Sequence, residues 1–287
     1  MGYSSRYHAA SIAAIFLALA IGILIGTGLG DTVVSGTQKQ LEESLTGDLE
    51  DARSEADKLA SRLNDEREFG QRIYPLLVGG KLRGQRVGIV ALGGLSGKTS
   101  DLIELGLAPT GAEVVQVSVI REPPNLEALA ERLRRSAYRN IATDPATLER
   151  FGERLGRQLV RGGRVARRTR GQALSRSSGQ LGRLEGVVVV RETPDDLEGE
   201  EETSVRRLEE GVLMGVRSAG VPAVGVELSD AKSSSVNTFD EQGLSTVDSV
   251  DLVSGRASMV FVLLGAEGQF GIKGSADRLL PDLLISD

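Results

Sequence analysis

The fold is decided by residues 85–120, QRVGIVALGGLSGKTSDLIELGLAPTGAEVVQVSVI. The apolar run from Gln85 to Ala91 is typical of a buried strand, and a glycine-rich turn follows it. A helix is expected from about Thr99 to Leu107, and a second strand from Glu113 to Ile120. This order of elements predicts a βαβ unit with two parallel strands.

The sequence after this unit repeats the alternation of strands and helices. Further apolar strands are expected at Gly186 to Val190 and at Pro222 to Glu227, and their continuous apolar character is typical of a sheet covered on both faces. The apolar segment from Gly255 to Gly265 is consistent with either a helix or a strand. Three further helices are expected, at Asn125 to Asn140, Asp144 to Val160 and Glu201 to Ala219. The pattern predicts an α/β fold with a mainly parallel sheet flanked by helices.

An uncharged run from Ala9 to Leu29 predicts one transmembrane helix ahead of this domain. At about 1.5 Å per residue, a helix of this length spans the roughly 30 Å hydrocarbon core of a bilayer. A cleaved signal peptide is the alternative, but its apolar region is shorter, at about 7 to 15 residues. Arg6 precedes the run, whereas Asp31 follows it and no basic residue occurs before Lys39. Because basic residues favour the cytoplasmic side, we expect a single-pass cell-membrane protein with an extracytoplasmic C-terminal domain.

Two patterns in the N-terminal region predict a homodimer. Glycines spaced by four line one face of the membrane helix and permit close approach of a second helix, although glycine is also frequent in membrane helices generally. Apolar residues with alternating spacings of four and three then form the seam of a coiled coil. The glycines are Gly22, Gly26 and Gly30, and the seam residues are Leu45, Leu49, Ala52, Ala56, Leu59 and Leu63.

The helical pattern of this stalk fades at Glu68 to Arg72 and is expected to stop at Tyr74-Pro75, because proline disfavours helix in the residue before it. An intramolecular helix packed against the domain is the alternative to a coiled coil. The predicted organisation is a cytoplasmic tail at 1–8, a transmembrane helix at 9–30, a coiled-coil stalk at 31–74 and an extracytoplasmic α/β domain at 75–287.

The composition excludes several classes of protein. The formal net charge of -6 argues against a nucleic-acid-binding protein, which normally carries a basic surface. With no cysteine, the chain has no disulfides, thiolate nucleophiles or cysteine-ligated metals. The only histidine, His8, lies before the membrane run, so no base is available for a Ser-His-Asp triad in the domain. We therefore expect a protein that is not an enzyme.

The glycine-rich turn from Gly93 to Thr99 resembles a phosphate-binding loop, because it joins a strand to a helix and contains Lys98. The spacing of that motif would require glycine at position 92, where this chain has Leu92. We expect a plain turn whose helix is capped near Ser96, and no nucleotide binding.

A basic segment is a candidate site for an anionic partner, such as phosphate polymers, lipid head groups or an acidic protein surface. An acidic cluster from Glu192 to Glu202 follows it, so the alternative is a solvated, partly self-neutralising surface. The candidate residues are Arg157, Arg161, Arg164, Arg167, Arg168 and Arg170.

Three aspartates, Asp240, Asp248 and Asp251, lie close together in the sequence. Carboxylates in such a group can bind a hard cation, but aspartate at turns more often caps helices or closes Asx turns. We assign no metal site to them.

Three blocks of sequence resemble one known family. They are the N-terminal segment around Arg6, His8 and Phe16 to Gly22, the segment Gly243 to Asp251 (GLSTVDSVD), and the segment Gly268 to Lys273 (GQFGIK) with Leu279-Leu280-Pro281. In order and spacing, the chain resembles the MctB-type proteins of actinobacteria and some other bacteria, which are described as copper transport proteins or channels.

The resemblance implies a membrane-anchored protein of the bacterial cell envelope that takes part in copper transport or tolerance. Some relatives are associated with cell-wall remodelling and separation of daughter cells through a partner protein, so the alternative is a non-catalytic coiled-coil scaffold or regulator. Copper prefers cysteine, methionine and histidine ligands, and the chain has only Met1, Met214, Met259 and His8. We assign no cofactor, and copper is implied by the resemblance alone.

Overall fold

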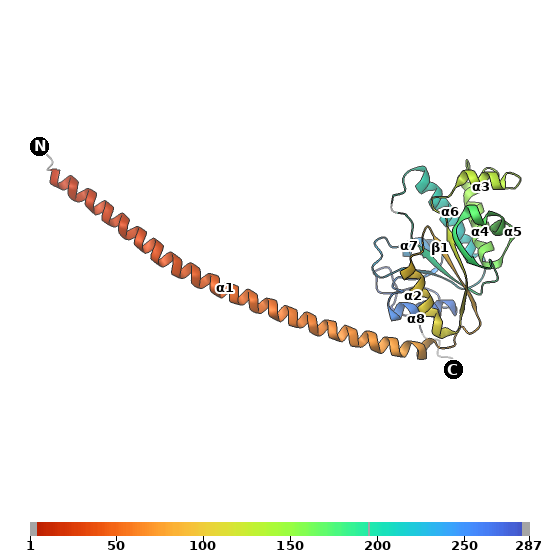
Figure 1. Cartoon of the computed structure of the whole chain (residues 1–287), viewed down its shortest axis with the longest axis horizontal. Helices are drawn as coiled ribbons and strands as arrows, with labels where there is room; N and C mark the ends of the chain where they lie inside the picture. The colour runs from red at the N-terminus through yellow and green to blue at the C-terminus, as the bar shows by residue number, and fades with distance from the viewer. Residues whose placement is uncertain (1–4, 195, 283–287) are drawn as a thin grey trace. The chain divides into compact units, whose positions relative to one another are not determined.

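The computed structural model describes residues 5–194 and 196–282, and for residues 5–9 and 27–43 it describes only the course of the helix backbone. The chain forms two compact units, which divide between Glu66 and Arg67. The first unit contains most of helix α1, and the second contains the end of α1 and the α/β fold (Figure 1).

Helix α1 runs without interruption from Ser5 to Val78, a length of 74 residues. The expectation that it stops at Tyr74-Pro75 is wrong. Tyr74 and Val78 are buried in the core of the second unit, and the Tyr74 hydroxyl donates a hydrogen bond of 2.6 Å to the carbonyl of Gly106. This packing outweighs the local preference against helix before Pro75.

The described residues contain no helix that combines the length and the apolar character needed to cross a lipid bilayer.

The second unit contains one sheet of seven strands in the order β3-β2-β1-β4-β5-β6-β7. All neighbouring strands are parallel except β2 and β3, so the predicted mainly parallel α/β fold is confirmed. The sequence did not predict β3, β6 and β7, which are short or largely polar. The strands are β1 Arg86–Leu92, β2 Glu113–Ile120, β3 Leu174–Gly179, β4 Gly186–Arg191, β5 Ala223–Val226, β6 Ser245–Val247 and β7 Gln269–Phe270.

Helices cover both faces of this sheet. The helix expected from Asn125 to Asn140 is shorter than predicted, because α3 ends at Leu133 and turns follow it. The ambiguous segment from Gly255 to Gly265 is a helix, and α5 and α7 were not predicted. The elements are α2 Gly97–Leu107, the 3-10 turn η1 Ala108–Thr110, α3 Leu126–Leu133, α4 Pro145–Arg161, α5 Arg164–Ala173, α6 Glu200–Arg217, α7 Val236–Glu241 and α8 Val253–Leu263.

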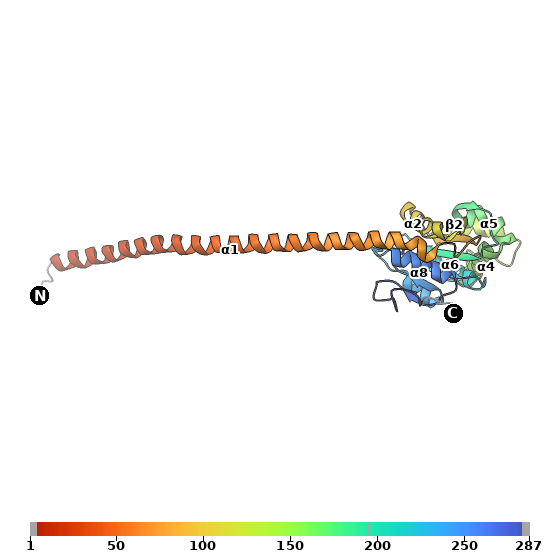
Figure 2. The same ribbon diagram turned by 90° about the horizontal axis from the view of Figure 1, so that it is seen from below.

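The core consists of two apolar clusters, one on each face of the sheet. Along β1, Val90 and Leu92 point to the cluster formed with α3, α4, α5, α6 and α7, whereas Ile89 and Ala91 point to the cluster formed with α2, α8 and the end of α1. This alternation follows from the two-residue period of a strand. Figure 1 shows α2 and α8 apart from the group of α3, α4, α5 and α6, and Figure 2 shows the same unit from below.

Helices α4 and α6 pack with their backbones in contact. A Cβ atom on Gly156 of α4 would lie 2.2 Å from the carbonyl oxygen of Val212, and one on Gly211 of α6 would lie 2.2 Å from that of Glu149. Gly152 and Gly215 make equivalent approaches, at 2.7 Å and 2.1 Å. Each helix therefore presents two glycines, four residues apart, to the other helix.

Candidate functional site

The strand order places a ligand-binding crevice of the usual α/β kind at the carboxyl ends of the strands. β2 and β3 lie on one side of β1 in the sheet, whereas β4 to β7 lie on the other side. The strand order therefore reverses between β1 and β4, which is the topological switch point. A cavity of about 550 Å³ lies at this edge. Its lining comes from the β1–α2 turn and the ends of β4 and β5, and includes Ser96, Thr99, Glu192, Glu227 and Asp230.

The anion position at the start of α2 is filled by the protein's own carboxylate. Glu192 accepts a hydrogen bond of 2.7 Å from the backbone N–H of Ser96 and one of 2.8 Å from the Thr99 hydroxyl. Ser96 caps the helix as expected, since its side chain accepts the backbone N–H of Thr99. Lys98 pairs with Asp230 at 3.3 Å. The turn that resembles a phosphate-binding loop is thus built around Glu192.

The glycine at the start of this turn is required by its surroundings. Gly93 has φ +74°, and a Cβ there would lie 2.6 Å from the Glu192 carbonyl oxygen and 2.7 Å from a carboxylate oxygen of Glu122. Both carboxylate oxygens of Glu122 are buried. The pKa of Glu122 is raised to about 8, chiefly by burial and also by the negative charge of Glu209, while the positive charge of Arg191 opposes the shift. Sequence reasoning missed this carboxyl, because its burial depends on β1, β4 and α6.

Arg191 is bound to Glu209 through two hydrogen bonds, of 2.7 Å and 3.1 Å. Thr193 donates a further hydrogen bond of 2.8 Å to the same carboxylate. Glu209 is almost fully buried, at 2% exposure, so this network ties α6 to the end of β4.

The aspartates considered as a cation site each bind protein groups that are distant in the sequence. Asp248 accepts the backbone N–H groups of Ile272 and Lys273, at 2.9 Å and 2.7 Å. Asp251 accepts the backbone and hydroxyl groups of Ser229, at 2.7 Å and 2.6 Å. Burial alone would raise the pKa of Asp251, but these hydrogen bonds outweigh burial and lower it. These contacts join residues 22 to 25 positions apart, so neither aspartate forms the helix cap or Asx turn considered from the sequence, and both instead link distant segments.

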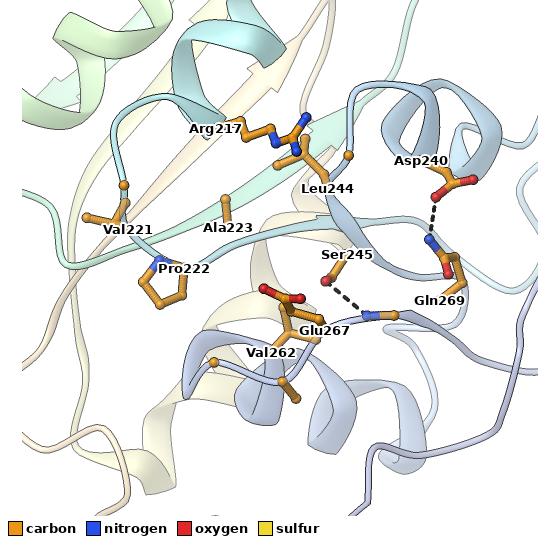
Figure 3. A pocket seen from close by; sticks show the side chains of 15 residues that line it. Arg217, Val221, Pro222, Ala223, Asp240, Leu244, Ser245, Val262, Glu267 and Gln269 are labelled. Carbon is orange, nitrogen blue, oxygen red and sulfur yellow. Dashed lines mark hydrogen bonds between the residues drawn. The ribbon is translucent and has the colours of Figure 1, made fainter.

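A second cavity, of about 500 Å³, lies at the opposite edge of the sheet, where β5, β6 and β7 begin (Figure 3). Its polar groups mostly bind one another. Ser245 accepts the backbone N–H of Gly268 at 3.1 Å, Asp240 accepts a hydrogen bond from the Gln269 amide, and Arg217 donates to the carbonyl of Gln242 at 3.3 Å. This arrangement explains the third aspartate as a structural acceptor.

The six predicted arginines do not form one site. Arg157 binds Glu153 and the Ser218 hydroxyl, and Arg170 binds the Ser177 hydroxyl at 3.0 Å. Arg164 and Arg168 are exposed at the surface of α5. Arg161 and Arg167 line a pocket of about 1020 Å³.

Two further arginines complete this pocket, and neither is among the six predicted candidates. Arg86 comes from the start of β1, far in sequence from the predicted segment, and Arg183 comes from the loop before β4, at the end of the basic stretch. We call Arg86, Arg161, Arg167 and Arg183 the arginine pocket.

The residues predicted to form a dimer seam all face solvent in the single chain. Leu45, Leu49, Leu59 and Leu63 are between 50% and 58% exposed, and the two seam alanines, Ala52 and Ala56, are exposed too. A Cβ on Gly22 or Gly26 would have no neighbour within 4 Å. Gly30 lies outside the residues whose side chains are described.

The donor set for copper is poor in the part of the chain that the structure describes. Met259 is fully buried, with its methyl group against Gly106, and Met214 is half-buried on α6. Within residues 5–194 and 196–282, no group of three histidine or carboxylate side chains is arranged to hold a metal ion. The side chain of His8 lies outside the described residues.

Comparison with known proteins agrees with the resemblance seen in the sequence. No curated protein sequence matches the chain. One family model, described as copper transport outer membrane protein MctB, matches residues 3–281. That match covers nearly the whole chain, including all three blocks that carry the resemblance. The chain therefore belongs to the MctB family of copper transport outer membrane proteins.

Proposed function

We propose that this protein is a membrane-attached, dimeric component of copper transport or tolerance in the bacterial cell envelope. The family match supports the copper role and the envelope location. The row of exposed leucines on α1 supports the dimeric part of the proposal, because two copies of this helix could pair through them. In this proposal the protein is not an enzyme, and its α/β domain lies outside the cytoplasm.

Attachment to a membrane is supported by the apolar side chains near the start of α1. From Ile12 to Ile25, nine large apolar side chains are between 52% and 76% exposed. Each Å² of apolar surface left in water costs about 25 cal/mol, so this segment favours a lipid environment. We propose single-pass insertion through residues 9–30. Resistance of the full chain to alkaline carbonate extraction tests insertion, and cleavage of the domain by protease added outside spheroplasts tests its side.

Pairing of two chains is supported by the continuity of the heptad pattern on an unbroken helix. The seam runs from Leu45 to Leu63 within α1, and its side chains have no covering partner within one described chain. Membrane attachment would restrict two copies to a surface and raise their effective concentration, which offsets the small area that Ala52 and Ala56 bury.

Copper is the transported substrate in this proposal rather than a resident cofactor. The domain lacks cysteine and histidine, the ligands that copper prefers together with methionine. Its contribution would therefore be assembly with other envelope components instead of coordination of copper inside the α/β fold.

The alternative is a scaffold or regulator that presents the domain to a partner in cell-wall remodelling or cell separation. The same exposed stalk supports it, and it requires no copper ligands at all. The two functions differ in whether copper handling changes when the protein is altered.

The test uses a bacterial strain that lacks its own member of the family. The full chain should restore growth on copper and normal cellular copper content by elemental analysis, and Leu59→Asp with Leu63→Asp should not. If growth on copper and copper content are the same with and without the protein while cell separation is corrected, the scaffold function holds. Titration of the purified protein with Cu(I) and Cu(II) adds a direct readout, because tight stoichiometric binding would contradict indirect participation.

A further inference from the structure

We propose that the arginine pocket is a binding site for a phosphate-bearing anion. This inference is independent of the copper function and of the stalk. It rests on a pocket of about 1020 Å³ to which four separate segments of the chain each contribute one arginine. The acidic residue that lines it is Glu185, whose carboxylate accepts the backbone N–H of Arg86 at 2.9 Å.

The four guanidinium groups are not paired with carboxylates in the described residues, so their charge is available to a ligand. Among the ion pairs of the described residues, none includes Arg86, Arg161, Arg167 or Arg183. Arg157 on the same helix is instead paired with Glu153. Four like charges that share one pocket repel each other, and a multiply charged anion would relieve this repulsion.

Two of the arginines are held in place by backbone carbonyls. Arg161 donates from Nε to Ala219 at 2.7 Å and from a terminal nitrogen to Gly220 at 3.2 Å. Arg86 donates from Nε to the carbonyl of Arg183 at 3.2 Å. Because a guanidinium has five N–H donors, both groups keep donors for a ligand after these contacts. Orienting them in advance lowers the entropy cost of binding.

The loop that carries Arg183 is fixed and strained. Arg183 has φ 60°, a left-handed conformation that non-glycine residues rarely adopt. A Cβ on the preceding Gly182 would lie 2.4 Å from the backbone of Gly162, and the Gly182 N–H donates to the buried Gln116 side chain at 2.9 Å. Glycine would be the less strained choice at position 183, so an arginine there indicates a use for its side chain.

The start of α5 adds to the positive potential. Gly163 precedes the helix without a side-chain cap, and the first turn contains Arg164 and Arg167 but no acidic residue. Basic residues at this end oppose the helix dipole, and a bound anion would offset that cost. The Val165 and Ala166 N–H groups are taken by Gln158, at 2.8 Å and 3.2 Å, so the ligand would meet arginine side chains rather than these amides.

Phosphate is the chemistry that fits this arrangement best. Arginine binds phosphate through paired N–H donors, and one phosphate group carries up to two negative charges near neutral pH. The pocket is large enough for several linked phosphates. The source would be either a soluble polyphosphate-like anion or the head group of a lipid, and the probes below distinguish them.

Calorimetry on the full chain in a non-ionic detergent tests the proposal, with tripolyphosphate and dihexanoyl-phosphatidylglycerol as probes. Arg167→Gln and Arg183→Gly should each weaken binding about tenfold, as expected for loss of a charge-assisted contact. Arg183→Gly is expected to fold, because glycine tolerates φ 60°. Arg168→Gln is the matched control, since it removes the same charge from the neighbouring position outside the pocket.

Tripolyphosphate binding that depends on Arg167 and Arg183 but not on Arg168 supports a soluble ligand. The same dependence with the lipid probe alone assigns the pocket to a head group. Absence of binding by both probes, or equal loss in Arg168→Gln, overturns the proposal.

Discussion

The backbone of Val212 in α6 leaves no room for a side chain at Gly156 of α4, where a Cβ would lie 2.2 Å from the Val212 carbonyl oxygen. Both partners in this clash are parts of helix backbone, so neither can move without separating the helices. Close packing here joins the two longest helices of the second unit, α4 and α6.

Gly156→Ala is therefore expected to destabilise the domain by about 1–3 kcal/mol, the usual range for overpacking a close contact. Scanning calorimetry of the full chain should record a fall in Tm of roughly 2–4 °C per kcal/mol. Gly171→Ala on α5 is the matched control, because a Cβ there has open space. Since alanine favours helix over glycine by about 0.5–1 kcal/mol, the control should keep or raise Tm, and a loss at Gly171 equal to that at Gly156 would contradict the packing explanation.

Replacing Leu59 and Leu63 by aspartate should convert dimers of the full chain to monomers, because the charges would face each other across the seam. Light scattering in detergent, corrected for bound detergent, measures the change in mass. Ser54→Asp with Ser61→Asp places the same charges on the opposite face of the heptad and should leave the dimer intact. An unchanged mass for the leucine variant would exclude the coiled coil.

We expect that no nucleotide binds at the β1–α2 turn. Because Glu192 binds Ser96 and Thr99 where a phosphate would otherwise sit, ATP and GTP would meet a carboxylate. Calorimetry with either nucleotide should give the same heat for the parent protein and for Lys98→Ala. A nucleotide affinity that depends on Lys98 would show that the turn opens to accept phosphate.

Stability should fall as pH rises through neutrality because of Glu122. Its pKa is raised from 4.5 to about 8 in the folded protein, so the folded state binds the proton more tightly than the unfolded state between these values. By linkage, this group's contribution to the free energy of unfolding declines from about pH 4.5 to about pH 8 and is then constant. The folded state is thus most stable when the Glu122 carboxyl is neutral.

Glu122→Gln should remove this slope and make the variant more stable than the parent above pH 8. Urea unfolding at several pH values measures the difference. Glu127→Gln, on the exposed surface of α3, serves as the control and should keep the parent's slope. If the free energy of unfolding depends on pH in the same way for Glu122→Gln and the parent, the carboxyl of Glu122 does not have a raised pKa.

Strong local patterns account for the parts of the fold that the sequence predicts. β1, β4 and β5 are apolar apart from a terminal arginine in β1 and β4, and this is the signal of a strand covered on both faces, while β2 has polar residues at some positions and valine at most of the others. β3 has the sequence LSRSSG, which has no apolar pattern, and it forms only because β2 offers a partner. The prediction that the helix ends at Tyr74-Pro75 rested on local propensity, and it was wrong because Tyr74 is buried against α2 and α8.

The arginine pocket shows the same limit. Arg161 and Arg167 were found because they lie in an obvious basic run. Arg86 and Arg183 join them only through the pairing of β1 with β4, which no local pattern reveals. Glu122 is hidden for the same reason, since a glutamate before two prolines gives no sign of burial.

The two ends of the sheet have a consequence for copies of the chain held at high local concentration. One edge is the polar strand β3, with Arg176 and three serines, and the other is β7, only two residues long. Neither offers the long apolar row of unpaired amides that lets sheets add to one another. Crowded copies are thereby protected against strand-by-strand polymerisation, and productive contacts are directed to the helices.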